Sequence, residues 1–518
     1  MSASRAPVRV VRPWLSLLLL ACACGGSAGE RGAAGNEALS GAQVAALTRR
    51  DSAMERADEK LSPPLRQQLA ELAPGALLEV VVDLRDQVDP LRLAALVDTR
   101  PRSRRERRAL AVEAARRVAD AGQRRVRRTL DSLTALGVVS AHRGYTVMNR
   151  FIVEATPDVV RVLARHPDVS RIIPATVKEP EVPMYRRREH GRARDAQGEL
   201  PPWALGAVGA DSAWRLGLAG GGAVVGIIDA GASASHEQLR TGFRGGAASW
   251  YDPRGRSASP TDGPQGHGTG ILSLAVGRAA GRYSIGVAPG AQWVACVGLP
   301  EGRYDAARVT ECAEWIFATA QPDVLIAPWL IADASCDRSL EPIVNAWRAA
   351  EILPVFAAGN EGPAAGSGGS PANYADLYPG AAVATSVGGV GRDRRVYTRS
   401  SRGPNRCTGG VYPLLVAPAE DVTVAYPLSP TMYVRTAGTS YAAGLVAGAA
   451  ALLFERHPEA RVVEIEEALR AGARDVGFPG ADHTFGFGAL YIPGALAALD
   501  RIRAAAPARG LHDVPADR

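Results

Sequence analysis

The stretch AGTSYAAGLVAGAAALL, residues 437–453, constrains the fold of this chain more than any other segment. After Thr439 and Ser440 it is apolar on every side, and charge returns only at Glu455 and Arg456. A helix without a polar face is normally buried in the core of a large domain. The two hydroxyl residues suit its first turn, because their oxygens can cap free backbone N–H groups. The stretch therefore predicts a helix that runs through the interior of a sizeable domain.

Ser440 would lie at the N-terminus of that helix, where backbone N–H groups and the helix dipole favour negative charge. Such a position suits a nucleophile whose attack on a carbonyl creates an oxyanion. The Gly-Thr-Ser sequence also fits a capped core helix with no chemical role. The choice between these two interpretations depends on the rest of the chain.

The charge of the chain is basic and uneven. The formal net charge is +7 over 518 residues, a length that allows one or two domains with real cores. The basic residues gather at 99–128 and 186–194 and are almost all arginine, since Lys60 and Lys178 are the only lysines. Such clusters can indicate a nucleic-acid partner. However, the arginines of 99–128 lie within an Ala-, Leu- and Val-rich helical pattern, which favours a solvated helix face, so we expect no nucleic acid.

The N-terminus has the pattern of an export signal. Three arginines within residues 5–12 precede an apolar segment, residues 14–21, that is too short to span a bilayer. The segment runs into Cys22 and resembles the lipobox of bacterial lipoproteins, where the cysteine is lipidated. We expect a signal peptide over 1–24 and lipid on Cys22, with an ordinary cleaved signal peptide as the alternative. The expected location is the bacterial cell envelope or the outside of the cell.

A small unit is expected over 76–174, between two linkers. Residues 25–75 are expected to be a linker, because most of this segment is rich in Gly, Ala and polar residues. The order βαββαβ within 76–174 is that of a ferredoxin-like α+β sandwich. Residues 175–202 are rich in proline and arginine and are expected to be an exposed, cleavable linker. The strands are expected at 77–84, 138–142, 145–155 and 169–174, and the helices at 104–136 and 157–166.

From 203 to 499 the pattern changes to alternating strands and helices, and a C-terminal tail over 500–518 follows. The strands are continuous apolar runs, as expected for parallel strands that are buried on both faces. This alternation predicts an α/β domain with a doubly wound, mostly parallel sheet. In such sheets the chemistry gathers at the carboxyl ends of the strands. The expected strands are GGAVVGIID, AQWVACVGL, DVLIAPWLI, LPVFAAG and AAVATSVGG.

Four polar residues lie at the ends of these strands or the starts of helices. Asp229 follows the first apolar strand, His267 precedes an apolar helical run, and Asn360 follows the fourth strand. Ser440 begins the buried helix. A serine needs a base to become a nucleophile, and a histidine base needs a carboxylate that fixes its tautomer. An amide can donate to the oxyanion. Together, the four residues have the functional groups that acyl transfer requires.

The motifs around these residues resemble those of the subtilases, the subtilisin-like serine peptidases, and are most similar to the bacillopeptidase F-like branch. GIIDAG resembles the aspartate motif, HGTG the histidine motif, FAAGNEGP the oxyanion motif and GTSYAAGLVAG the serine motif, in the family's order. The resemblance implies that Asp229 is the charge partner, His267 the general base, Asn360 the oxyanion donor and Ser440 the nucleophile.

The resemblance also implies a function for the whole chain. It implies a serine endopeptidase that hydrolyses polypeptide substrates through an acyl-enzyme and is made as a zymogen. The 76–174 unit would be an inhibitory, chaperone-like propeptide. No cofactor is expected to be required. Subtilases often bind structural calcium, but the sequence contains no metal-binding pattern from which ligands can be assigned.

The chain departs from the family pattern at several positions, none of which removes one of the four groups. The strand edge that pairs with substrate usually reads Ser-Trp-Gly or Ser-Leu-Gly, whereas Pro328, Trp329 and Leu330 stand here. Proline lacks an N–H, and leucine is bulky where glycine leaves room. With Ala358 and Gly359, these residues form the expected substrate cleft. The other departures are Ala230 after the aspartate, Gly270 past the histidine, Gly444 and Leu445 after the serine, and Ala419 after Pro418.

These departures leave a second hypothesis open. The chain would then be a pseudo-enzyme of the subtilase fold that binds peptides or partner proteins without turnover. A nucleotide-binding domain beginning at GLAGGGAVVGIID is disfavoured, because its glycines precede the strand, whereas a dinucleotide loop must follow one.

Four cysteines belong to the catalytic region, and an exported chain permits disulfides. Cys296 ends a strand and Cys312 lies in the helix after it, so this pair is the first choice. Cys336 and Cys407 are the pair that remains. Free buried thiols are the alternative.

Overall fold

The computed structural model describes residues 57–73, 75–88, 103–176, 203–278, 284–331, 336–374 and 385–505. The expected signal peptide, Cys22 and nearly all of the expected linker over 175–202 lie outside the described residues. The described chain divides into two compact units. Of the described residues, the first contains those of 57–87 and 117–176, and the second contains Val88, 103–116 and those from 203 onward.

The first unit is built on an antiparallel sheet of four strands in the order β2-β3-β1-β4. Two helices complete the βαββαβ order, so the unit has the ferredoxin-like arrangement that the sequence indicates. Its core includes Val80, Val82, Phe151, Val153 and Leu163. The elements are β1 (Leu78–Leu84), α5 (Arg104–Ala135), β2 (Val139–Tyr145), β3 (Arg150–Ala155), α6 (Pro157–Arg165) and β4 (Val169–Pro174), of which α5 belongs to this unit only from Arg117 onward.

The linker expected over 25–75 is wrong at its C-terminal end. Helix α3 (Pro63–Glu71) lies there, with proline at its first turn. Leu61, Leu65 and Leu69 recur at helical spacing, and all three are buried in the core of the first unit. The expected domain boundary at residue 76 therefore falls inside the folded unit.

The second unit contains a seven-stranded sheet in the order β11-β10-β9-β8-β5-β7-β6. Every pairing in it is parallel, as the apolar strands predict. The strands are β5 (Val224–Asp229), β6 (Trp250–Tyr251), β7 (Gln292–Val297), β8 (Val324–Ala327), β9 (Leu353–Ala357), β10 (Thr385–Val390) and β11 (Leu415–Pro418). A separate antiparallel pair joins β12 (Val422–Ala425) and β13 (Tyr433–Thr436).

Helices cover both faces of this sheet, which makes it doubly wound. Val225 and Ile227 of β5 belong to one core cluster with the helices α10 and α13. The intervening Gly226 faces Ile316 and Pro322 on the other side, because side chains alternate along a strand. The helices of this unit are α7 (Trp203–Val208), α8 (Ala210–Arg215), α9 (Glu237–Arg240), α10 (His267–Val276), α11 (Ala306–Trp315), α12 (Glu341–Ala349), α13 (Thr439–Arg456), α14 (Val462–Ala471) and α15 (Ile492–Ala505), with the short turns η1 (Pro300–Gly302) and η2 (Ile316–Ala320).

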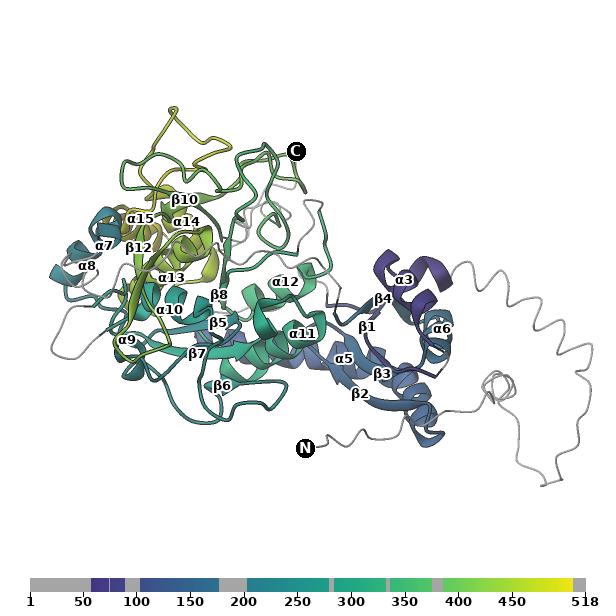
Figure 1. Cartoon of the computed structure of the whole chain (residues 1–518). Coiled ribbons are helices and arrows are strands. Elements are labelled where there is room, and N and C mark those ends of the chain that lie inside the picture. Colours follow the sequence, from purple (N-terminus) through teal and green to yellow (C-terminus); the bar gives the residue numbers. More distant parts are fainter. Residues whose placement is uncertain are drawn as a thin grey trace, which may run out of the picture. The chain divides into compact units, whose positions relative to one another are not determined.

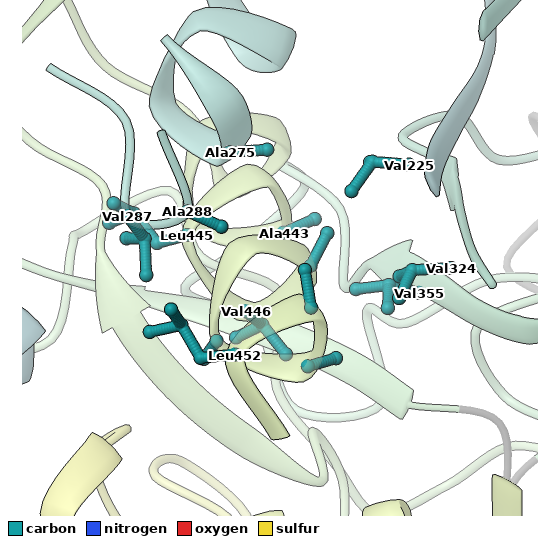
Figure 2. Packing of buried hydrophobic residues seen from close by; sticks show 14 of the residues in the cluster. Val225, Ala275, Val287, Ala288, Val324, Val355, Ala443, Leu445, Val446 and Leu452 are labelled. Atoms are coloured by element: carbon teal, nitrogen blue, oxygen red, sulfur yellow. The ribbon is translucent and has the colours of Figure 1, made fainter. Parts of the chain in front are cut away.

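Helix α13 is the buried helix that the stretch 437–453 predicts. All of its residues from Thr439 to Phe454 are buried, and it packs against β8, β9, β10, β11 and α10 (Figure 1). Figure 2 shows Ala443, Leu445, Val446 and Leu452 among the valines and alanines that surround it. The last helix, α15, extends to Ala505, beyond the expected end of the domain at 499.

Glycines allow α10 and α13 to approach each other. A Cβ on Gly444 would lie 2.6 Å from the Ile271 oxygen. A Cβ on Gly448 would lie 2.7 Å from the Ala275 oxygen. Since real Cβ atoms do not come this close to a carbonyl oxygen, these positions require glycine.

Candidate active site

Asp229 and His267 form a buried pair at the carboxyl edge of the sheet. Asp229 is the last residue of β5, and His267 is the first residue of α10. His267 Nδ1 lies 2.8 Å from Oδ2 and 3.1 Å from Oδ1 of Asp229. The Asp229 side chain is fully buried and that of His267 is 3% exposed. Asp229 Oδ1 also accepts the N–H of Ala230 at 2.7 Å, so the carboxylate is held from two sides.

The charge of Asp229 sets the protonation of His267. Burial lowers the pKa of His267, but the charge and hydrogen bond of Asp229, assisted by the charge of Asp262, outweigh it and raise the pKa above its usual value. An imidazole held in this way keeps its proton on Nδ1, which leaves Nε2 as the basic nitrogen.

Close contact between backbones brings these two residues together. A Cβ on Gly268 would lie 2.0 Å from the Gly231 oxygen and 3.0 Å from the Cβ of Asp229. Gly231 itself has φ of 147° and leaves no room for a side chain beside Thr261. The glycines next to the two catalytic candidates therefore allow the helix start to lie directly against the strand end.

Asp262 is a second buried carboxylate at this site, and the sequence analysis missed it. Its Oδ2 accepts the N–H of Thr269 in the first turn of α10 at 2.8 Å. Burial, together with the charge of Asp229, raises the pKa of Asp262 to about 7. The only sign of this residue in the sequence is its position, five residues before the histidine. It lies in a loop without periodicity, so the sequence pattern does not predict its contacts.

Ser440 lies in the first turn of α13, where only 2% of the residue is exposed. Its Oγ donates to the Pro328 oxygen at 3.2 Å. The preceding residue, Thr439, contacts Asn360: the Thr439 N–H donates to Asn360 Oδ1 at 3.1 Å, and its hydroxyl donates to the same oxygen at 3.3 Å. Because Oδ1 is occupied by Thr439, the amide nitrogen of Asn360 is the end that remains to act as a donor elsewhere.

The residues expected to line the substrate cleft follow two neighbouring strands. Pro328, Trp329 and Leu330 come directly after β8, and Ala358 and Gly359 directly after β9. The Trp329 indole N–H donates to the Ile228 oxygen at 3.0 Å, so this side chain is turned into the sheet next to Asp229.

Leu330 packs against Gly359, where a Cβ would lie 2.6 Å from Leu330 Cδ1. Gly359 has φ of 107°, a conformation that favours glycine. The leucine therefore occupies space beside the strand end that a glycine would leave open.

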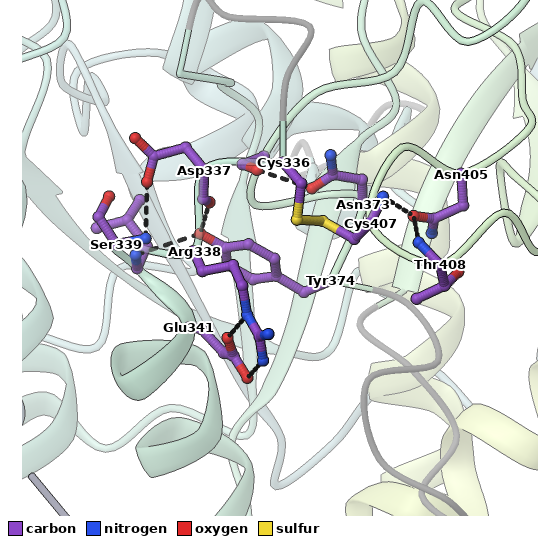
Figure 3. Close-up of a disulfide and its surroundings, with 12 residues drawn as sticks. Cys336, Asp337, Arg338, Ser339, Glu341, Asn373, Tyr374, Asn405, Cys407 and Thr408 are labelled. Carbon is purple, nitrogen blue, oxygen red and sulfur yellow. Dashed lines mark hydrogen bonds and ion pairs between the residues drawn. A yellow bond between two sulfur atoms is a disulfide. The ribbon is translucent and has the colours of Figure 1, made fainter.

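Two disulfides stabilise loops and elements around the sheet. Cys296 of β7 is bonded to Cys312 of α11, and Cys336 is bonded to Cys407, which are the pairs that the sequence analysis preferred. Asn405 accepts the N–H of Cys407 at 2.8 Å (Figure 3). The second bond joins segments 71 positions apart.

Within the part of the chain that the structure describes, no group of three or more His, Cys, Asp or Glu side chains could hold a metal ion. The described residues therefore offer no carboxylate cluster to which structural calcium could be assigned. No helix among them combines the length and the apolar character that a membrane crossing requires.

The fold and this site define the class of the protein: a doubly wound α/β domain with an Asp–His pair and a serine at a helix N-terminus, both at the carboxyl edge of a parallel sheet, as in serine hydrolases. The model of the subtilase family matches residues 220–488, which include all four candidate residues. The chain therefore belongs to the subtilase family, the family of subtilisin-like serine peptidases.

Several characterised subtilases are similar to the chain. Bacillopeptidase F of Bacillus subtilis is 28% identical over 412 residues, which cover 73% of this chain and 27% of that protein. Subtilisin Savinase of Lederbergia lenta is 31% identical over 276 residues, which cover 53% of this chain and 92% of that protein. The minor extracellular protease Epr of Bacillus subtilis is 27% identical, over 57% of this chain and 42% of that protein. The chain thus spans about a quarter of bacillopeptidase F but nearly all of Subtilisin Savinase.

Proposed function

We propose that this chain is an active serine endopeptidase with Asp229, His267 and Ser440 as its catalytic triad and Asn360 as an oxyanion donor. The observation that carries the proposal is the buried hydrogen bond between Asp229 and His267. The end of the neighbouring strand β8 accepts a hydrogen bond from Ser440. Membership of the subtilase family supports polypeptides as the substrates.

Ser440 Oγ attacks the scissile carbonyl while His267 Nε2 accepts its proton, and Asp229 stabilises the imidazolium that forms. Asn360 Nδ2 donates to the oxyanion, since its Oδ1 is held by Thr439. His267 then gives the proton to the leaving amine, and water hydrolyses the acyl-enzyme by the same steps in reverse order.

The ferredoxin-like unit is proposed to be a propeptide that assists folding and inhibits the enzyme. Its support is the resemblance to bacillopeptidase F, which extends over 412 residues, more than the region 203–499 contains. Cleavage is proposed within 175–202. We also propose export by the signal peptide over 1–24, with lipid on Cys22 or release from the cell.

One observation favours a binding protein without turnover as the second candidate. Leu330 fills space beside Gly359 at the strand edge on which a substrate would lie. If that edge no longer admits a polypeptide, the triad would be present but unused.

A fluorophosphonate probe distinguishes the two candidates, because it reacts with an activated serine without needing the substrate cleft. The full chain and its Ser440→Ala and His267→Ala variants would be labelled and tested on casein. An active peptidase labels and hydrolyses casein, and both variants lose both properties. Labelling by the Ser440→Ala variant equal to the parent would refute the assignment of the nucleophile. Labelling of the parent without hydrolysis would favour the binding protein.

A further inference from the structure

The first part of α5 carries three arginines that are turned into the second unit. Arg104, Arg107 and Arg108, which we call the arginine clamp, lie on one face of the helix. Arg104 and Arg107 are each only 8% exposed, and the side chain of Arg108 is 14% exposed. Arg105 between them is exposed. All three belong, with residues 103–116, to the same compact unit as the peptidase sheet.

Two carboxylates just before strands of the sheet pair with the clamp. Arg104 Nη1 lies 3.0 Å from Asp323 Oδ1, and Arg107 Nε lies 2.8 Å from Glu351 Oε1. Asp323 directly precedes β8 and Glu351 lies just before β9. The Glu351 side chain is only 2% exposed, so the arginines compensate charge that is held away from water.

Both carboxylates also accept backbone hydrogen bonds within the second unit. The other oxygen of Asp323 accepts the N–H of Val224 at 2.8 Å, where β5 begins. Glu351 accepts the N–H of Val462 at 2.9 Å, where α14 begins. The clamp therefore pairs with carboxylates that accept backbone N–H groups at the starts of two elements, β5 and α14.

Arg108 binds backbone carbonyls at the C-terminal ends of two helices. It donates to the oxygens of Gln321 at 2.8 Å and Pro322 at 3.1 Å, just after η2. It donates to the oxygens of Ala350 at 3.0 Å and Glu351 at 3.2 Å, just after α12. Helix C-termini present unsatisfied carbonyls and partial negative charge, which a guanidinium matches.

Arg104 also reaches the end of the serine-bearing helix. Its guanidinium lies 3.7 Å from the centre of the Phe454 ring, and its backbone N–H donates to Glu459 at 2.7 Å. Because the sheet is parallel, the residues before β8 and β9 lie at the edge opposite to Asp229. The clamp therefore does not touch the proposed catalytic residues.

We propose that the segment 103–116 is a lasting part of the peptidase unit, and that the arginine clamp keeps the N-terminal part of the chain bound after the linker over 175–202 is cut. This inference rests on the zymogen part of the proposed function. Dissociation would leave Glu351 with Arg461 but without Arg107, and would leave the carbonyls after two helices without Arg108. Since the clamp binds away from the catalytic edge, the clamp itself does not cover the proposed catalytic residues.

The test uses the full chain with Ser440→Ala and a recognition site for an added, site-specific protease within 177–202. The cut is then independent of the chain's own activity. We expect the two fragments to elute together in size-exclusion chromatography after the cut. The Arg107→Ala, Arg108→Ala variant should lower the affinity between the fragments at least a hundredfold.

A matched control removes the same charge from the same segment. Arg105→Ala with Arg116→Ala changes two exposed arginines and should leave the affinity within threefold of the parent. Immediate separation of the parent fragments would overturn the inference, and so would equal affinity of the clamp and control variants. If the double clamp variant does not fold, Arg108→Lys is compared with Arg105→Lys. Lysine keeps the charge but cannot reach four carbonyls, so only Arg108→Lys should weaken binding, and equal behaviour would again overturn the inference.

These outcomes are separable from those of the proposed function. Fluorophosphonate labelling reports on Ser440 and His267 alone. Fragments that separate while the parent still labels would refute the clamp and leave the peptidase proposal intact.

Discussion

Nδ1 of His267 lies 2.8 Å from the carboxylate of Asp229, and neither side chain is more than 3% exposed. A buried carboxylate in this position favours one tautomer of the imidazole and stabilises its protonated form during the reaction. The first prediction follows from this contact.

Asp229→Asn should reduce kcat by about 10⁴-fold, because an amide that donates to Nδ1 stabilises the wrong tautomer. The rate would be measured on a chromogenic peptide, with circular dichroism as the check on folding. Asp393→Asn, at an exposed position, is the control and should leave kcat unchanged. A folded Asp229→Asn enzyme within tenfold of the parent would contradict the assigned role.

The pH dependence of kcat/KM should reflect the raised pKa of His267. The base must be unprotonated, so activity is present above this pKa and is lost as pH falls through it. The midpoint of the acid limb should therefore lie above about 6.5, the ordinary value for histidine. Profiles would be recorded at constant ionic strength, and a midpoint well below 6 would show that His267 is not held by Asp229 as described.

Asp262→Asn should move that acid midpoint downward. The charge of Asp262 contributes to the raised pKa of His267, and asparagine retains an oxygen for the Thr269 N–H. Activity at pH 6 would then rise relative to activity at pH 9. A purely structural role would change kcat without moving the midpoint, and an upward shift would refute the electrostatic role.

Leu330→Gly should raise kcat/KM for peptide substrates by about tenfold, in the range that removal of a steric clash of this size allows. The change opens space beside Gly359, where the leucine side chain now packs. The gain should appear chiefly as a lower KM, while labelling by the fluorophosphonate should stay the same. Unchanged or weaker peptide hydrolysis would show that Leu330 belongs to the substrate site rather than obstructing it.

The order and type of the main elements could be predicted from the sequence because each depends on local periodicity. The apolar strands placed Asp229 and Asn360 correctly at strand ends, and the apolar run after Ser440 indicated the buried helix. Asp262 was not found, because its contact with Thr269 depends on how a loop without periodicity folds back on the helix start.

The predicted boundaries of elements and domains are wrong where tertiary contacts determine them. Helix α3 was assigned to a linker, although its leucines have helical spacing, because a short amphipathic helix of nine residues is difficult to distinguish from a polar tether. Helix α5 was correctly predicted as a helix, but nothing local indicates that Arg104 and Arg108 contact segments more than 200 positions away. Contacts of this kind are visible only in the folded chain.

The glycine contacts between α10 and α13 have a consequence for how this enzyme can change. One helix begins with His267 and the other carries Ser440 in its first turn, and the two are kept at a fixed separation by backbone contacts at Gly444 and Gly448. A methyl group added deep in the core would thus displace the two proposed catalytic side chains relative to each other. We accordingly expect substitutions that change substrate preference to lie in the segments that follow β8 and β9. Substitutions at the interface between the two helices should not be tolerated.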